Sequence, residues 1–322
     1  MSDPYGVPEC RRPSPLPLVN AVRVEVDAWR AGGYAGASTT SRRLLEHWFL
    51  DEHRTPDGEP FAYFFAQREA TETIVYLHEV AQVRTTGQLI ARYAGTPVAA
   101  AGEPFPRYVV KMATGSGKTK VMSLAIAWSY FHALREAGSA LSATSLVVAP
   151  NLIVFERLRA DFGAGRIFRS DPVVPPEWAG DFDLQVVLRD DPAPVSSAGA
   201  LFLTNVHVLY ERRTPPPPNP VEGLLGPAPP RSAHTGEPPL RRLAARGPVL
   251  VVNDEAHHLH DDVRSDPGNR SWRSGPSSGC TSSATASLLS STSPPRPATS
   301  RASHSARSSP TTRWQPRSTT AS

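Results

Sequence analysis

Lysine is nearly absent from this chain, and several other features are scarce or missing. Only three of the 322 residues are lysine, against 31 arginines. The two cysteines, Cys10 and Cys280, lie far apart and form no Cys-x-x-Cys pair, which argues against a disulfide scaffold or a zinc site. No run of 18 apolar residues occurs, so we expect no membrane-spanning helix. The polar, proline-rich N-terminus has no apolar core of a secretory signal, so we expect a cytosolic protein.

Acidic residues are scarce in the last part of the chain. Residues 263–322 contain eight arginines, one aspartate and 18 serines. The preceding 262 residues carry 26 basic and 29 acidic residues, so the net charge of +4 comes from this tail and indicates no basic nucleic-acid-binding face. The tail shows no helical or strand periodicity, which predicts disorder. Its abrupt start favours an out-of-frame translation of a GC-rich gene.

Short apolar strands alternate with helices in the middle of the chain. We expect strands at 107–112, 145–149, 184–188, 200–204 and 249–253, and helices at 118–136 and 151–160. This alternation is typical of an α/β fold in which helices cover both faces of a parallel sheet. The proline-rich stretch 212–248 is expected to be an extended insertion on the surface or a linker.

The first hundred residues are predicted to be mainly helical. Ser41 is placed to cap a helix over 42–49, a turn is expected at 55–58, and a second helix over about 66–85. The chain then divides into three parts. They are a helical extension (1–100), an α/β domain (101–262) and a disordered tail (263–322).

All three lysines lie in one segment that has the pattern of a phosphate-binding loop. A glycine-rich turn follows the strand at 107–112 and opens the helix at 118–136. Glycines let backbone N–H groups point at phosphates, and the start of the helix adds positive charge. We expect Lys118 to reach the β- and γ-phosphates of ATP and the Thr119 hydroxyl to hold Mg²⁺. The nucleotide-binding residues of this loop are then Thr114, Gly115, Ser116, Gly117, Lys118 and Thr119.

Two carboxylates follow the strand at 249–253. Asp254 is expected to hold Mg²⁺, partly through water, and Glu255 to orient the attacking water. An Asp-Glu pair at a strand end is commonly the start of a solvated loop, but the upstream phosphate-binding loop makes the pair specific. The polar residues that follow are expected to be loop residues rather than a separate metal site. They are His257, His258, His260, Asp261 and Asp262.

The segment Asp254–His257 spells a DEAH box, and with the loop it resembles the DEAH-box branch of superfamily 2 helicases. The wider pattern, over roughly residues 20–262, is similar to the ATPase-motor (Res) subunit of type III restriction enzymes. The resemblance implies a RecA-like fold for 101–262 and ATP hydrolysis that depends on DNA. In that interpretation Glu255, Asp254 and Lys118 are the catalytic residues.

The resemblance also implies roles for residues outside these two motifs. Gln67, in the segment 64–70, would hydrogen-bond the adenine edge. Two strand ends would contact the nucleic-acid backbone through Pro150 and Asn151, and through Thr204 and Asn205. The implied partners are double-stranded DNA and a modification or nuclease subunit.

The sequence departs from the family pattern after the DEAH box. No second RecA-like domain or arginine-finger motif is recognisable, and the proline-rich insert lengthens the spacing between the two main motifs. The triplet Ser283–Thr285 repeats a family motif, but no apolar strand precedes it, so we interpret it as chance. We therefore expect a truncated motor domain that binds ATP and hydrolyses it slowly. The alternatives are an inactive remnant that binds ATP or DNA, and a P-loop enzyme of another class, such as a nucleotide kinase.

Overall fold

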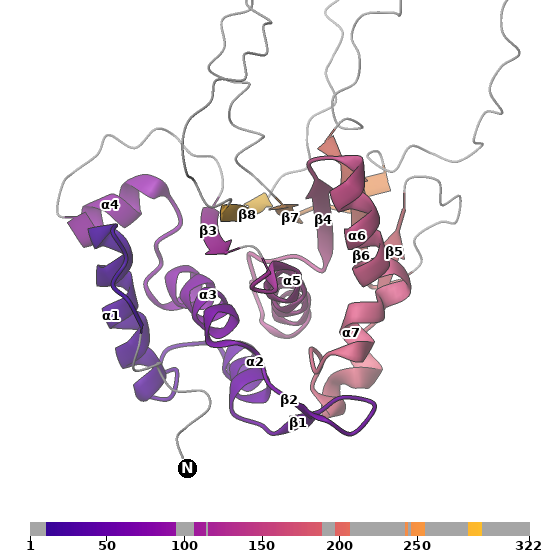
Figure 1. Ribbon diagram of the computed structural model, residues 1–322, viewed down its shortest axis with the longest axis horizontal. Helices are drawn as coiled ribbons and strands as arrows, with labels where there is room; N and C mark the ends of the chain where they lie inside the picture. Colours follow the sequence, from indigo (N-terminus) through magenta and orange to yellow (C-terminus); the bar gives the residue numbers. More distant parts are fainter. Residues whose placement is uncertain are drawn as a thin grey trace, which may run out of the picture.

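The computed structural model describes residues 11–94, 106–113, 115–188, 197–206, 242–243, 246–254 and 283–291 (Figure 1). Helices on one side form a layer that packs against the helices of an α/β unit. Among the described residues, no helix has the length and apolar character needed to cross a membrane.

The N-terminal layer is mainly helical, as predicted. Its elements are α1 (Pro17–Ala31), α2 (Thr39–Phe49), β1 (His53–Arg54), β2 (Pro60–Phe61), α3 (Phe65–Val75), the π-helical turn η1 (Tyr76–Val80) and α4 (Thr86–Ala94). The expected turn joins β1 to β2, where the Gly58 amide donates to the Thr55 carbonyl at 2.9 Å. Two boundaries were wrong. Ser38 caps α2, since its side chain accepts the Ser41 amide at 3.1 Å, and the second helix ends at Val80.

The α/β unit contains every strand and helix that the sequence predicted for it. Its elements are β3 (Arg107–Ala113), α5 (Lys118–Arg135), β4 (Thr144–Ala149), α6 (Leu152–Phe162), η2 (Gly163–Gly165), α7 (Arg166–Ser170), η3 (Pro176–Asp181), β5 (Leu184–Val187), β6 (Gly199–Asn205), β7 (Val249–Asp254) and β8 (Ser283–Ser291). Of the proline-rich stretch 212–248, only residues 242–243 and 246–248 lie within the described part of the chain.

The six strands form one sheet in the order β3-β8-β7-β4-β6-β5. Strands β5, β6, β4 and β7 are parallel, with Ala149 opposite Asn205 and Val148 opposite Asn253. Strand β8 pairs antiparallel with both β3 and β7, so β3 and β7 run in the same direction. The carboxyl ends of β3, β4, β6 and β7 therefore lie at one edge of the sheet. This parallel α/β arrangement is consistent with the RecA-like fold.

Strand β8 is a correction to the sequence analysis, which expected no strand in the tail. It begins at Ser283, the first residue of the triplet that we interpreted as chance. A strand between two others is held by backbone N–H and C=O groups, which every non-proline residue carries. An apolar pattern is therefore not required for pairing, and periodicity does not reveal such a strand. The other residues of the predicted tail lie outside the described part of the chain.

Apolar side chains cover both faces of the parallel strands. One face packs into the main core with helices α1–α3 and α5–α7 through Val147, Ala149, Leu201, Leu203, Leu250 and Val252. The opposite face forms a smaller cluster in which Leu146, Val148, Phe202 and Val249 pack with Leu243. Strands buried on both faces appear in the sequence as continuous apolar runs, which explains why they were easily predicted.

Two buried tryptophans attach α2 to the α/β unit. The indole N–H of Trp48 donates to the Val173 carbonyl at 2.8 Å. The indole N–H of Trp128, on α5, donates to the Ser41 hydroxyl at 2.7 Å. Replacing a buried tryptophan by alanine typically costs about 3–5 kcal/mol, so we expect these contacts to fix the layer against α5.

Candidate nucleotide-binding site

The sheet brings most of the sequence-predicted site residues to one edge. The glycine-rich loop follows β3, Pro150 follows β4, and Thr204 and Asn205 end β6. Asp254 is the last residue of β7. Gly115 and Asp254 lie 139 positions apart in the chain, and this topology brings them to the same edge of the sheet. Ligands in open α/β sheets bind at the carboxyl ends of the strands. The described site residues therefore lie where a nucleotide site is expected.

Two glycines of the glycine-rich loop have a left-handed backbone conformation. Gly115 and Gly117 both have φ of +79°, in the left-handed region that glycine adopts freely. Gly117 is the residue before α5, a helix of 18 residues whose first amides point toward the loop. A Cβ on Gly117 would also overlap the end of the Gln67 side chain, so any other residue there would have to displace Gln67. Lys118 and Thr119 begin α5 and are half-buried. Thr114 lies outside the described residues.

Gln67 links the helical layer to the glycine-rich loop. Its Oε1 accepts the Phe64 amide at 2.9 Å, which caps the start of α3. Its Nε2 donates to the Ser116 carbonyl at 2.9 Å. The side chain is buried, and these two backbone groups satisfy both ends of its amide. The structure thus places Gln67 beside the glycine-rich loop, while its implied contact with adenine stays a prediction.

A cavity of about 220 Å³ lies beside the start of α5. Its lining includes Gly117, Thr119, Lys120, Arg166, Ser170 and Asp171. Lys120 forms an ion pair with Asp171 and lies 4.8 Å from the centre of the Phe61 ring. Burial, with a smaller contribution from the Asp171 charge, raises the pKa of the nearby Tyr63 phenol. The sequence analysis did not identify α7 or Asp171 as neighbours of the loop, because the contact joins residues 51 positions apart.

Asp254 is almost completely buried and has a cationic partner from α6. Its Oδ2 accepts a hydrogen bond from Nη2 of Arg157 at 3.0 Å. A buried carboxylate is costly without a positive partner, and Mg²⁺ is a partner of the same kind. A carboxylate and a hydroxyl are oxygen ligands of the kind that Mg²⁺ prefers, so Asp254 and Thr119 at this edge of the sheet fit a Mg-nucleotide chemically. Glu255 and His257 lie outside the described residues.

The residues predicted to contact nucleic acid lie between β4 and α6 and at the end of β6. Asn151 is exposed and caps α6, where its Oδ1 accepts the Val154 amide at 2.9 Å. Asn205 lies opposite Ala149, one residue before Pro150, so the two strand ends are adjacent. Thr204 is buried and is therefore poorly placed to touch a backbone phosphate directly in this conformation. Contact with nucleic acid stays a prediction for all four residues.

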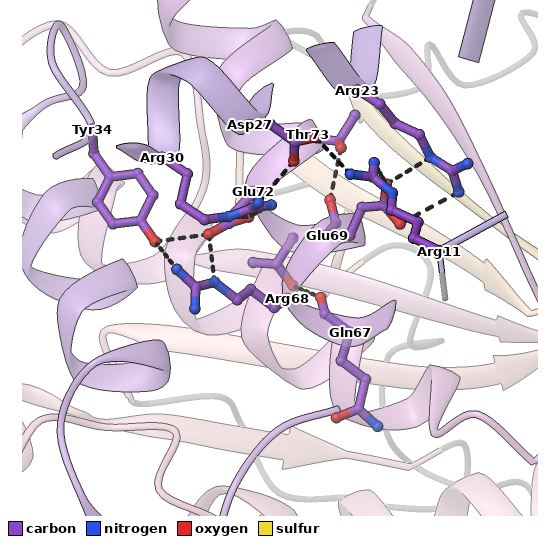
Figure 2. A network of polar contacts seen from close by, with 11 residues as sticks. Arg11, Arg23, Asp27, Arg30, Tyr34, Gln67, Arg68, Glu69, Glu72 and Thr73 are labelled. Atoms are coloured by element: carbon purple, nitrogen blue, oxygen red, sulfur yellow. Dashed lines mark hydrogen bonds and ion pairs between the residues drawn. The ribbon is translucent and has the colours of Figure 1, made fainter. Parts of the chain in front are cut away.

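Behind the site, α3 carries a network of ion pairs that the sequence analysis missed (Figure 2). Glu72 is fully buried and accepts hydrogen bonds from Arg30 Nε at 2.7 Å, Arg68 Nε at 2.8 Å and the Tyr34 hydroxyl at 2.7 Å. Burial and the charge of Glu72 raise the pKa of Tyr34. One turn earlier, Glu69 pairs with arginines from the N-terminal segment and α1, namely Arg11 and Arg23. The network fixes α3, the helix that positions Gln67.

In the described part of the chain, no cluster of three or more histidine, cysteine or acidic residues could hold a metal ion by itself. The histidines after the DEAH box lie outside that part, so their role as loop residues stays a prediction.

Comparison with known proteins identifies the family. The family model described as "Type III restriction enzyme, res subunit" matches residues 64–275, a range that contains Gln67, the glycine-rich loop and Asp254. The chain matches none of the curated proteins and none of the solved structures. The family match covers more than half of the chain and agrees with the α/β fold and the shared sheet edge. The chain therefore belongs to the family of type III restriction enzyme res subunits, which contains ATP-dependent motor domains of the helicase type.

Proposed function

We propose that this chain binds Mg-ATP at the carboxyl edge of its sheet and uses it as the motor domain of a DNA-dependent ATPase in a restriction system. One observation carries the proposal: the sheet places the glycine-rich loop, Asp254 and the strand ends at Asn151 and Asn205 along one edge. Nucleotide chemistry and nucleic-acid contact can then be coupled over a short distance. The DNA partner is proposed to be double-stranded, with a modification or nuclease subunit as a further partner.

Within this proposal each site residue has a distinct role. Lys118 offsets negative charge on the β- and γ-phosphates, and Thr119 and Asp254 hold Mg²⁺, the latter partly through water. Glu255 orients the attacking water. Gln67 positions the loop and recognises adenine, and Pro150, Asn151, Thr204 and Asn205 contact the nucleic-acid backbone. Bound Mg²⁺ would supply charge stabilisation for the transferring phosphoryl group.

Binding of a non-hydrolysable ATP analogue tests the nucleotide site. We expect Lys118→Ala to weaken binding by roughly tenfold or more, because charge-assisted hydrogen bonds to phosphate are lost. Calorimetry on the full chain in Mg²⁺ measures this, with Lys111→Ala on β3 as the matched lysine control. Equal affinities of wild type and Lys118→Ala would refute the assignment.

Phosphate release with and without double-stranded DNA separates the motor from a remnant that only binds. We expect slow turnover, because an arginine finger contributes roughly 10³–10⁵ in rate and none of the proposed site residues is an arginine. Glu255→Gln is the blank. DNA-stimulated release that disappears in Glu255→Gln would show that the chain works as a complete motor, alone or as an oligomer.

A further inference from the structure

Arg157 forms an ion pair with Asp254 in which the two partners have very different surroundings. The Asp254 side chain is 1% exposed, whereas the Arg157 side chain is 57% exposed. Nη2 of Arg157 lies 3.0 Å from Oδ2 of Asp254, and the two residues lie 97 positions apart in the chain. The buried carboxylate therefore has a strong need for a cation, while the arginine can leave for solvent at little cost.

Mg²⁺ and the Arg157 guanidinium would compete for the same Asp254 carboxylate. Both neutralise Asp254, and two cations close to one carboxylate repel each other. The proposed function places Mg²⁺ on Asp254, partly through water. Binding of Mg-ATP should then weaken the hold of Asp254 on Arg157.

The same helix carries a residue predicted to contact DNA. Helix α6 starts after Asn151, its N-cap, and includes Arg157. Its far half is anchored in the core by the fully buried Leu158 and Phe162. In its first turn Leu152 and Ile153 are exposed, and Val154 and Phe155 are only partly buried against the core. The end of α6 nearest the DNA-contact residues is therefore less deeply packed than its far end, and the Arg157–Asp254 pair is a polar restraint between α6 and the sheet.

We propose that Arg157 is a positioning residue that occupies Asp254 as an exchangeable cation, and that Mg-ATP displaces it and thereby transmits nucleotide binding to the DNA-contact end of α6. The inference rests on the proposed Mg-ATP site. It adds Arg157 as a cation that competes with Mg²⁺ for Asp254, and α6 as the element that connects the nucleotide site to Asn151.

The first test is binding of the ATP analogue to the full chain by calorimetry, in Mg²⁺ and in EDTA. Arg157→Gln should tighten binding in Mg²⁺ roughly three- to tenfold, because the competing cation is removed. It should have no effect in EDTA. Arg159→Gln is the matched control, since Arg159 lies on the same helix, is similarly exposed and pairs with Glu156 instead. In an Asp254→Asn background the effect of Arg157→Gln should disappear.

The second test measures the affinity for a double-stranded oligonucleotide by fluorescence anisotropy, with and without the analogue. Wild type should change its DNA affinity when Mg²⁺ and the analogue bind, and Arg157→Gln should have the same DNA affinity in both conditions. A variant that keeps the full nucleotide response would overturn the proposed transmission.

The outcomes separate this inference from the proposed function. Weaker binding by Arg157→Gln in both Mg²⁺ and EDTA would mean that the arginine contacts phosphate, which overturns the exchange while the nucleotide site stands. Unchanged binding in Mg²⁺ would also overturn the exchange. If wild type and Lys118→Ala bind the analogue equally, the nucleotide site itself is wrong.

Discussion

Two buried carboxylates, Glu72 in the helical layer and Asp254 at the edge of the sheet, are both neutralised by arginines, but the arginines differ in their exposure to solvent. Glu72 pairs with Arg30 and Arg68, whose side chains are themselves only 10% and 5% exposed. Asp254 pairs with Arg157, most of which faces solvent. The partners of Glu72 cannot leave without exposing or stranding buried charges. Arg157 can leave, and the carboxylate that it neutralises is the one proposed to hold Mg²⁺.

This difference separates a structural ion pair from one suited to function. Breaking the fixed pair should destabilise the fold, whereas breaking the exchangeable pair should change ligand binding. The predictions that follow test the fixed side of the comparison and its connection to the site, from the largest expected effect to the smallest.

The largest effect is expected from Glu72→Gln. The amide keeps the shape but removes the negative charge beside two buried guanidinium groups, of which Arg30 keeps its ion pair with Asp27. We therefore expect a loss of about 3 kcal/mol in the free energy of unfolding. Urea denaturation measures it. The control is Glu177→Gln, because Glu177 is 47% exposed in its pair with Arg43 and should cost less than about 1 kcal/mol. Similar costs for the two variants would remove the distinction between fixed and exposed pairs.

A smaller loss of folding stability is expected when the pH is lowered and the buried His78 becomes protonated. Burial, with contributions from the charges of Arg84 and His132, lowers the pKa of His78 to about 4. The unfolded chain binds a proton near pH 6.5, and the folded chain does so only near pH 4. Stability should therefore fall as the pH decreases from 6.5 to 4, by up to about 3 kcal/mol.

The variant His78→Phe tests this assignment. The Tyr108 hydroxyl, which lies 3.3 Å from Nδ1 of His78, keeps its bond to the Val83 carbonyl at 3.0 Å. We expect the variant to lose less stability than wild type over the same pH range, measured as the midpoint of thermal unfolding. Burial and the charge of His53 also lower the pKa of His47 to about 4. His47 should therefore leave part of the pH dependence of stability in the variant. An unchanged pH dependence would assign the effect to other groups.

The smallest effect concerns Gln67, which connects the helical layer to the loop. Gln67→Glu can still accept the Phe64 amide but places an oxygen against the Ser116 carbonyl. We expect a loss of about 1–3 kcal/mol in stability, and weaker binding of the ATP analogue because the loop is less well held. Gln67→Ala removes both bonds and shows whether the loop contact or the cap dominates. If Gln67 also recognises adenine, both variants should lose preference for ATP over GTP analogues.

Much of the α/β unit was predictable because its signals are local. Strands buried on both faces appear as apolar runs, and the loop at 114–119 shows its glycines and lysine within six residues. The boundary errors, such as Ser38 in place of Ser41 as the cap of α2, are also local and amount to a few residues. Strand β8 was missed because its backbone pairing leaves no periodic pattern to detect.

The sequence by itself determined the glycine-rich loop, the acidic strand end and the order of strands and helices around them, since each is encoded by neighbouring residues. Only the tertiary structure decided which charges meet. Arg30 reaches Glu72 across 42 positions, Gln67 reaches Ser116 across 49, and Arg157 reaches Asp254 across 97. Such partners are chosen by helix packing and strand order, because a buried charge takes whichever opposite charge the fold places within reach.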